Sequence, residues 1–239
     1  MIESYTRWII RWKYLVVIAS LAAVFATAAG GQFLGFSNDY RMFFGEENPQ
    51  LLAFEKMQKT FNKNDNIMFV ITPKSGKVFT KDTLTVVQDL TEEAWQTPFS
   101  TRVDSITNHQ HTAAEEDDLI VDDLVVDPEA LTESELLKIQ AIAINEPMLV
   151  HRLISPDSKY TGVNVTVQLP CKAIDEVPKA VAFARDLKQK MLEKYPDVEI
   201  RLVGMAVMNN AFPEASQDDV KNLYPLALGF IVLTLLILL

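Results

Sequence analysis

The sequence predicts an α+β protein in which a ferredoxin-like domain of split βαβ organisation is flanked by two transmembrane helices. Three observations lead to this prediction. Two long apolar runs without charged residues lie near the ends of the chain. The region between them alternates twice between strand and helix periodicity, and an insertion separates the two βαβ units.

The first apolar run, residues 14–35, predicts a transmembrane helix. No charged residue occurs from Tyr14 to Asn38, and at about 1.5 Å per residue this length crosses a hydrocarbon core of ~30 Å. A cleaved secretory signal is the alternative interpretation, because Ala26-Thr27-Ala28 fits a cleavage site. We favour the transmembrane helix because the run is longer than the apolar core of a typical signal.

Residues 1–13 form a short amphipathic segment in front of this run. Its cations are Arg7, Arg11 and Lys13, and its one acid is Glu3. An excess of basic residues beside a membrane helix is typical of the cytoplasmic side. We therefore expect the N-terminus in the cytoplasm and the region after the first helix outside it.

The second apolar run, residues 222–239, predicts the start of a second transmembrane helix. Its 18 residues reach about 27 Å, at the lower limit for crossing a bilayer. No basic or aromatic residue follows its last apolar stretch, although such residues usually mark the interface. We expect that this helix is truncated and that the chain is part of a larger protein.

Residues 36–221 predict one α+β domain, whose first βαβ unit lies before residue 107. The apolar run Ile67–Ile71 predicts a strand covered on both faces. Thr80 can cap the following helix, and Arg102–Ile106 is a candidate second strand. Apolar residues recur at helical spacing in that helix at Leu84, Val87, Leu90 and Ala94.

The second βαβ unit has the clearer periodicity. Apolar and polar residues alternate over 163–169 and again over 198–202, which predicts two half-buried strands. Asp175 opens the helix between them, and Gly204 ends the second strand. The helix positions expected to face the core are Val177, Val181, Ala184, Leu187 and Met191. In the ferredoxin-like arrangement both helices cover one face of the sheet.

An insertion of about residues 107–158 separates the two units. It begins with an acidic stretch, residues 115–129, which lacks the glycine-containing loop of a calcium site and alternates acids with apolar pairs. We interpret this stretch as a solvated face rather than a metal site. Thr132 and Glu135 have the spacing of a capping box and predict the start of a helix.

Composition and motifs argue against several classes of function. The chain has 22 Lys and Arg against 32 Asp and Glu, a formal charge of −10, which argues against a nucleic-acid partner. Cys171 is the single cysteine, so no intrachain disulfide can form. The sequence has no hydrolase elbow, zinc-protease helix or phosphate-binding loop, and His109 and His111 are better explained as polar loop residues than as metal ligands. We therefore expect neither an enzyme nor a cofactor or metal.

Several methionines of this region are expected to fill its core. On a domain that handles greasy ligands they could instead line an adaptable surface. They are Met42, Met57, Met68, Met205 and Met208.

A series of short motifs follows the first apolar run in a fixed order. The motifs are Phe36-Ser37-Asn38-Asp39-Tyr40-Arg41-Met42-Phe43-Phe44, Asn48-Pro49, Phe54-Glu55, Asp65-Asn66, Val78-Phe79, Val103-Asp104-Ser105-Ile106-Thr107-Asn108, and Asp218 to Pro225. Each is loose by itself. Their order, between one apolar helix and the next, resembles the first extracytoplasmic loop of the resistance-nodulation-division (RND) superfamily. The similarity is to the MMPL-type, hydrophobe-exporter branch, which is related to Patched and sterol-sensing proteins.

This resemblance implies the N-terminal part of a proton-driven exporter of hydrophobic or amphiphilic molecules. The domain would be a porter-type domain in the periplasm, held at the bacterial inner membrane. The implied partners are the remainder of the transporter, with later transmembrane helices and a second extracytoplasmic domain, the lipid bilayer and a hydrophobic substrate. A membrane-anchored periplasmic binding or adaptor protein without transport activity of its own is the alternative.

Proton coupling is expected to depend on residues outside this chain. Both apolar runs lack Asp, Glu, Lys, Arg and His, and coupling to a proton gradient requires an ionisable group within the membrane. The resemblance places the relay acids in later membrane helices. The sequence does not select among lipids, sterol-like molecules and lipophilic drugs as the substrate.

Two segments at the membrane boundary are candidates for coupling helix motion to the domain. One follows the first helix and the other precedes the second. The hypothesis pairs Arg41 of the first segment with Asp218 or Asp219 of the second. The Phe43 and Phe44 side chains are expected to pack into the base of the domain. An interfacial anchor of aromatic residues and a cation is the alternative. The candidate residues are Asp39, Tyr40, Arg41, Phe43, Phe44, Asp218 and Asp219.

Overall fold

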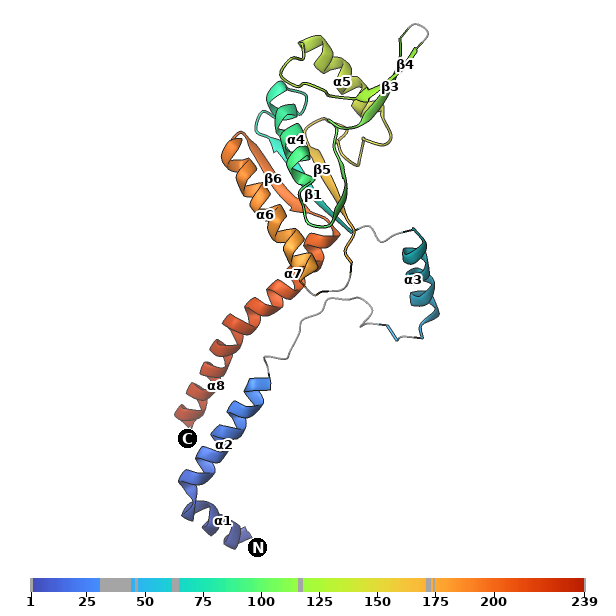
Figure 1. The fold of residues 1–239 in the computed structure, drawn as a ribbon. Helices are drawn as coiled ribbons and strands as arrows, with labels where there is room; N and C mark the ends of the chain where they lie inside the picture. The colour runs from blue at the N-terminus through green and yellow to red at the C-terminus, as the bar shows by residue number, and fades with distance from the viewer. Residues whose placement is uncertain are drawn as a thin grey trace. The chain divides into compact units, whose positions relative to one another are not determined.

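The computed structural model describes residues 2–30, 44–45, 47–61, 65–115, 118–170, 173 and 175–238. The chain divides into two compact units, Met1–Ser37 and Asn38–Leu239, and each is described by itself. Figure 1 shows the elements of both units. The structure mixes helices with an antiparallel sheet, which confirms the α+β class.

The first unit holds two helices, α1 (Ile2–Arg11) and α2 (Lys13–Ala29). Their directions, taken over Tyr5–Arg11 and Lys13–Thr27, differ by 86°. α2 covers most of the described part, residues 14–30, of the helix predicted over residues 14–35. By length and composition, the two helices qualify as a membrane span only when the bent pair is counted as one.

The second unit is built on a four-stranded antiparallel sheet with the strand order β2-β5-β1-β6. Helix α4 connects β1 to β2, and helix α6 connects β5 to β6. The bounds are β1 (Asp65–Pro73), α4 (Lys81–Ala94), β2 (Ser100–Asp104), β5 (Thr161–Val167), α6 (Glu176–Lys194) and β6 (Val198–Val203). The strands and helices predicted from periodicity are therefore confirmed as elements.

The core lies between this sheet and the helices α4 and α6, which contact each other and the strands beneath them (Figure 1). Every second residue of β1 is buried, and the register places Phe69 beside Val163 and Ile71 beside Ile200. Full burial of such a side chain stabilises the fold by about 1.5–3 kcal/mol. The helices add Leu84, Val87, Leu90 and Ala94 from α4 and Val181, Ala184, Leu187 and Met191 from α6.

The prediction that the first strand is covered on both faces is wrong. Met68 and Val70 alternate with the core residues of β1 and are only half-buried. Their cross-strand neighbours include the polar residues Asn164 and Arg201. The reason is that α4 and α6 cover one face of the sheet, so the other face is mixed in polarity and partly open.

The starts of α4 and α6 are held by different interactions. The Thr80 hydroxyl accepts a hydrogen bond from the backbone nitrogen of Thr83 at 3.3 Å, which confirms the predicted cap of α4. Asp175 precedes α6 but makes no capping bond with its side chain. Its carboxylate lies 2.6 Å from Lys179 Nζ instead.

The insertion forms a separate hairpin and a helix. Strands β3 (Gln110–Glu115) and β4 (Asp118–Asp123) pair only with each other in the described sheets, and α5 (Glu133–Asn145) follows. The predicted capping box is confirmed, because Thr132 and Glu135 exchange both of its hydrogen bonds. The hairpin was not predicted. Its apolar residues Leu119 and Val121 are more than half exposed.

Two further helical segments complete the second unit. Helix α3 (Pro49–Phe61), which the sequence did not predict, precedes β1. After β6 the chain forms one helical run, Met205–Leu238, made of α7 (Met205–Asp218), a π-helical turn η3 (Asp219–Leu223) and α8 (Tyr224–Leu238). This run is the one unbent helix among the described residues that is long and apolar enough to cross a membrane. The helix that carries the second apolar run therefore begins well before residue 222.

Candidate functional site

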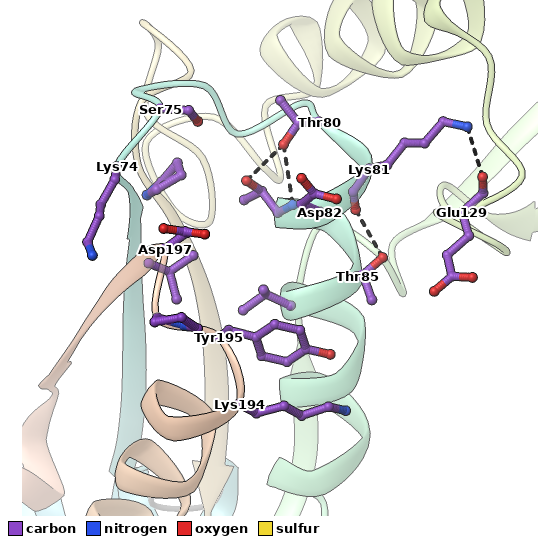
Figure 2. Close-up of a pocket in the computed structure, with 15 residues that line it drawn as sticks. Lys74, Ser75, Thr80, Lys81, Asp82, Thr85, Glu129, Lys194, Tyr195 and Asp197 are labelled. Carbon is purple, nitrogen blue, oxygen red and sulfur yellow. Dashed lines mark hydrogen bonds between the residues drawn. The ribbon is translucent and has the colours of Figure 1, made fainter.

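A cleft of about 870 Å³ lies where β1 ends and where α4 and β6 begin (Figure 2). Lys74, Asp82 and Asp197 line it, and Lys81 donates from Nζ to the Glu129 carbonyl oxygen at 2.9 Å. The lining therefore presents charges of both signs. A site for a hydrophobic molecule is instead lined mostly by apolar and aromatic side chains.

One wall of this cleft is held by a network between α4 and α6. Lys194 Nζ lies 2.5 Å from Asp89 Oδ2, and the Tyr195 hydroxyl donates to the same oxygen. Figure 2 shows Lys194 and Tyr195 extending from the end of α6 toward α4. Burial raises the pKa of Asp89, but the hydrogen bonds from Lys194 and Tyr195 outweigh it and hold that pKa below its ordinary value of 3.8.

The same network keeps the Tyr195 phenol protonated. Burial, together with its hydrogen bond to Asp89, raises the pKa of Tyr195 above its ordinary value of 10.0. A nucleophile would instead need a lowered pKa or an adjacent general base. We therefore read the network as a link between two helices rather than as a reactive centre.

At the other end of β6, the sheet meets the helix that returns toward the second apolar run. Gly204 joins β6 to α7 with a φ of +118°, a conformation that residues with side chains rarely adopt. A Cβ atom at this position would lie 2.4 Å from the carbonyl oxygen of Asn66. The backbone of β1 and the start of α7 are therefore in direct contact.

The Asn66 side chain fastens the start of α7 to two strands. Its Nδ2 donates to Asn164 Oδ1 on β5 at 2.9 Å, and its Oδ1 accepts from the Met205 backbone nitrogen at 3.1 Å. The second bond satisfies one of the N–H groups that a helix start leaves without an internal partner. Asn66 thus supplies the cap that Gly204 cannot supply, because glycine has no side chain.

Packing and an ion pair hold the next turns of α7 against the domain. Ala206 and Asn210 are buried. Arg185 of α6 donates to both carboxylate oxygens of Glu214 at 2.7 Å, and Asn210 donates to one of them at 2.7 Å. The hydrogen bond from Arg185 lowers the pKa of Glu214, against the smaller opposing effect of burial. Helix α7 is therefore joined to the domain from Gly204 to Glu214.

The side of α7 away from these contacts carries an apolar stripe. Met205, Met208 and Phe212 recur at helical spacing, and each is about half exposed. The expectation that Met205 and Met208 fill the core is wrong, because the buried side of the helix carries Ala206 and Asn210 instead. Met57 on α3 is also 50% exposed, whereas Met42 lies outside the described residues. Exposed methionines of this kind suit an adaptable apolar surface.

The structure describes only some of the predicted coupling residues. Phe44 is described and is 48% exposed. Asp218 ends α7 and Asp219 begins η3, and both are exposed. Their pairing with Arg41, which lies outside the described residues, stays a prediction. The remaining candidates lie outside the described part of the chain, namely Asp39, Tyr40, Arg41 and Phe43.

Sequence reasoning missed the role of four residues in fastening α7, namely Asn66, Arg185, Gly204 and Glu214. One signal was present, because a glycine between a strand and a helix often marks a close approach of two backbones. Asn66 belongs to the ordered motif Asp65-Asn66, but nothing in the sequence pattern indicated that it would cap a helix start 139 positions away.

Comparison with known proteins gives the family. No curated protein matches the chain closely enough to count as a relative. A family model described as the MMPL family matches residues 43–239, which include every element from α3 to α8. This match confirms the resemblance indicated by the ordered motifs. The chain belongs to the MMPL family and is part of an RND-type transporter.

Proposed function

We propose that this chain contributes a periplasmic porter-type domain and two membrane helices to a proton-driven exporter of hydrophobic or amphiphilic molecules. The observation that carries the proposal is the helical run Met205–Leu238. Its first part is fastened to the domain, and its last part, α8, contains no Asp, Glu, Lys, Arg or His. A single helix thus connects the domain to a segment suited to lipid.

The topology of the sheet supports the porter-type assignment. The order β2-β5-β1-β6, with a helix after β1 and another after β5, is the pattern of a split βαβ, ferredoxin-like sandwich. The hairpin and α5 lie between the two halves in sequence, as an insertion would. In this reading residues 14–35 and 222–239 are membrane segments and 36–221 is the periplasmic domain.

We propose two roles for this domain. It accepts substrate, and it moves when the membrane helices move. Because α7 is held by Asn66, Gly204 and the Arg185–Glu214 pair, displacement of α8 would be passed to the sheet as a rigid-body movement. The exposed acids Asp218 and Asp219 lie between the fastened part and the apolar part. They remain our candidates for contact with the segment after the first membrane helix.

The remaining assignments follow from the same proposal. The N-terminus would lie in the cytoplasm of a bacterial cell and the domain on the other side of the inner membrane. The partners would be the later transmembrane helices, a second extracytoplasmic domain, the bilayer and a hydrophobic substrate, with no nucleic acid. The chain itself would carry out no chemical reaction and hold no cofactor.

The experiment that tests this function uses the complete transporter in proteoliposomes with an imposed proton gradient. Export of a lipophilic fluorescent probe is measured for Arg185→Glu, Glu214→Arg and the double exchange. We expect each single change to lower gradient-driven export by at least about fivefold, within the usual range of coupling between sites, and the double exchange to restore part of it.

A matched control is available on β6. Arg201 Nε lies 2.8 Å from Glu199 Oε1, and both side chains are exposed. Exchange of these two charges should leave export unchanged. Probe transport at the same rate with and without the proton gradient would contradict the proton-driven exporter function. Unchanged export in the Arg185 and Glu214 single variants would contradict the coupling role.

A further inference from the structure

Helices α1 and α2 meet at almost a right angle. The angle between Tyr5–Arg11 and Lys13–Thr27 is 86°. Backbone hydrogen bonds continue on either side of the bend, from Trp12 nitrogen to Trp8 oxygen at 3.1 Å and from Val16 nitrogen to Trp12 oxygen at 2.9 Å. Both helices are therefore regular up to the bend, and the change of direction is confined to about one residue.

The two sides of α1 differ in chemistry. Tyr5, Trp8 and Ile9 follow the i, i+3, i+4 spacing of one helix face, and Trp12 at the bend continues it. Arg7 and Arg11 are one turn apart on the opposite side. Trp8 and Trp12 are 53% and 48% exposed. A helix of ten residues is marginal in water by itself, so an apolar surface is expected to stabilise this face.

The charge of this segment indicates which surface that is. Arg7, Arg11 and Lys13 against Glu3 give residues 1–13 a net charge of 3 − 1 = +2, in a chain whose total is −10. A basic helix with aromatic residues on its apolar side is typical of helices that lie in the interface of an anionic bilayer. The bend supplies the orientation. If α2 crosses the membrane with the usual tilt of about 20°, then α1 runs nearly parallel to its surface.

We propose that α1 is an interfacial helix that lies in the plane of the cytoplasmic leaflet at the start of α2. Its Tyr5, Trp8, Ile9 and Trp12 face rests against the acyl chains. Arg7, Arg11 and Lys13 face the phosphates of anionic phospholipids. This inference rests on the proposed function in taking α2 as a membrane helix and the N-terminus as cytoplasmic.

The experiment places one spin label at a time on the full chain in vesicles containing phosphatidylglycerol. Cys171 is first replaced by Ala, because it is the single native cysteine. The variants are Tyr5→Cys, Trp8→Cys, Arg7→Cys and Arg11→Cys, with Leu21→Cys in α2 as a reference. Collision with oxygen reports the acyl region, and collision with a water-soluble nickel chelate reports solvent.

We expect the labels at positions 5 and 8 to favour oxygen at a shallow depth, and those at 7 and 11 to favour the chelate. The Leu21 label should lie deeper than any of them. Equal chelate accessibility at all four positions, or a depth that increases steadily from position 11 to position 5, would overturn the inference. A water-exposed label at position 21 would overturn both the membrane assignment of α2 and the inference. A deep label at position 21, together with solvated labels at positions 5, 7, 8 and 11, would overturn the inference alone.

The anionic partner is tested by the triple change Arg7→Gln, Arg11→Gln and Lys13→Gln. In phosphatidylglycerol vesicles the ratio of inserted to solvated label at position 8 should fall roughly fivefold for each charge removed. In vesicles of phosphatidylcholine, the triple variant and the parent chain should give the same ratio. The matched control removes the exposed domain cations Lys74, Lys77 and Lys159 in the same way and should change nothing. An equal ratio for the triple variant and the parent chain would overturn the role of the phosphates.

Discussion

Gly204 and Asn66 are in backbone contact, so close that a methyl group at position 204 would lie 2.4 Å from the Asn66 carbonyl oxygen. This contact joins the last strand of the sheet, the first strand and the helix that continues into the apolar segment. A Gly204→Ala change therefore meets two costs, the positive φ and the clash with backbone. We expect it to lower the free energy of unfolding by roughly 2–4 kcal/mol, measured by urea denaturation of the detergent-solubilised chain.

Gly76 provides the matched control for this prediction. Its φ is +71°, but no atom lies within 4 Å of the Cβ that alanine would add. Gly76→Ala should therefore lose only the conformational part, about 1–2 kcal/mol. Equal losses for the two variants would mean that Asn66 moves aside without cost, and the proposed rigid contact would be wrong.

The pair formed by Asp89 and Lys194 makes stability depend on pH in a defined direction. Hydrogen bonds from Lys194 and Tyr195 hold the pKa of Asp89 below 3.8 in spite of burial. A lowered carboxyl pKa contributes stability above its ordinary value, and that stability is lost as pH falls through the folded pKa. The Asp89 hydrogen bond raises the pKa of Lys194, so that contribution is complete below pH 10.5 and is lost only at higher pH.

Asp89→Asn should therefore destabilise the domain by about 1 kcal/mol at neutral pH, a modest value because both side chains are partly exposed. The difference from the parent chain should shrink as the pH falls below 3.8. Urea unfolding at pH 7, 5 and 3 measures it. Glu93→Gln removes the neighbouring α4–α6 ion pair with Lys190, and serves as the control without a tyrosine partner. A difference that grows at low pH would contradict the assignment.

The caps of α4 and α6 give a paired prediction. Thr80→Ala removes a hydroxyl that accepts a hydrogen bond from Thr83, and should cost about 1 kcal/mol. Asp175→Ala removes no capping bond and only an exposed pair with Lys179, and should leave the stability nearly unchanged because exposed ion pairs contribute little. Thermal unfolding of both variants compares them. A larger loss for Asp175→Ala would show that its carboxylate acts on the helix start in solution.

Periodicity predicted the elements that bury one face against the main core. Leu84, Val87 and Leu90 recur on α4 because that helix must cover the sheet, and the alternation of Val163, Val165 and Val167 has the same cause. Burial on one side leaves a repeating pattern in the sequence. The prediction that β1 is covered on both faces failed for a related reason. Met68 and Val70 are apolar, but they lie on the partly exposed face of the sheet.

The hairpin β3–β4 and the start of α7 could not be predicted in this way. Leu119 and Val121 are exposed, so the hairpin is held by its cross-strand hydrogen bonds rather than by a buried face. The attachment of α7 depends on Asn66 and Arg185, which are distant in sequence from their partners Met205 and Glu214. Contacts between remote polar residues follow no period, so a single sequence does not reveal them.

Thr97 offers a test of a buried polar group without a partner. Its hydroxyl is the one buried side-chain oxygen or nitrogen, within the described residues, that makes no hydrogen bond, and the residue is only 2% exposed. Its backbone nitrogen is satisfied by Ala94 at 3.1 Å, so only the hydroxyl carries the desolvation penalty. Thr97→Val keeps the shape and removes that group. We expect it to raise the free energy of unfolding by about 1 kcal/mol.

Thr91 on α4 is the matched control for this change. It is also buried, but its hydroxyl donates to the Val87 carbonyl oxygen at 2.6 Å. Thr91→Val removes a hydroxyl that is already satisfied, so it should be neutral or slightly destabilising. Urea unfolding of the two variants under one set of conditions gives the comparison. If Thr97→Val destabilises the domain as much as Thr91→Val or more, the expectation is wrong. The Thr97 hydroxyl then has a hydrogen-bond partner in solution, such as a water molecule that enters the loop between α4 and β2.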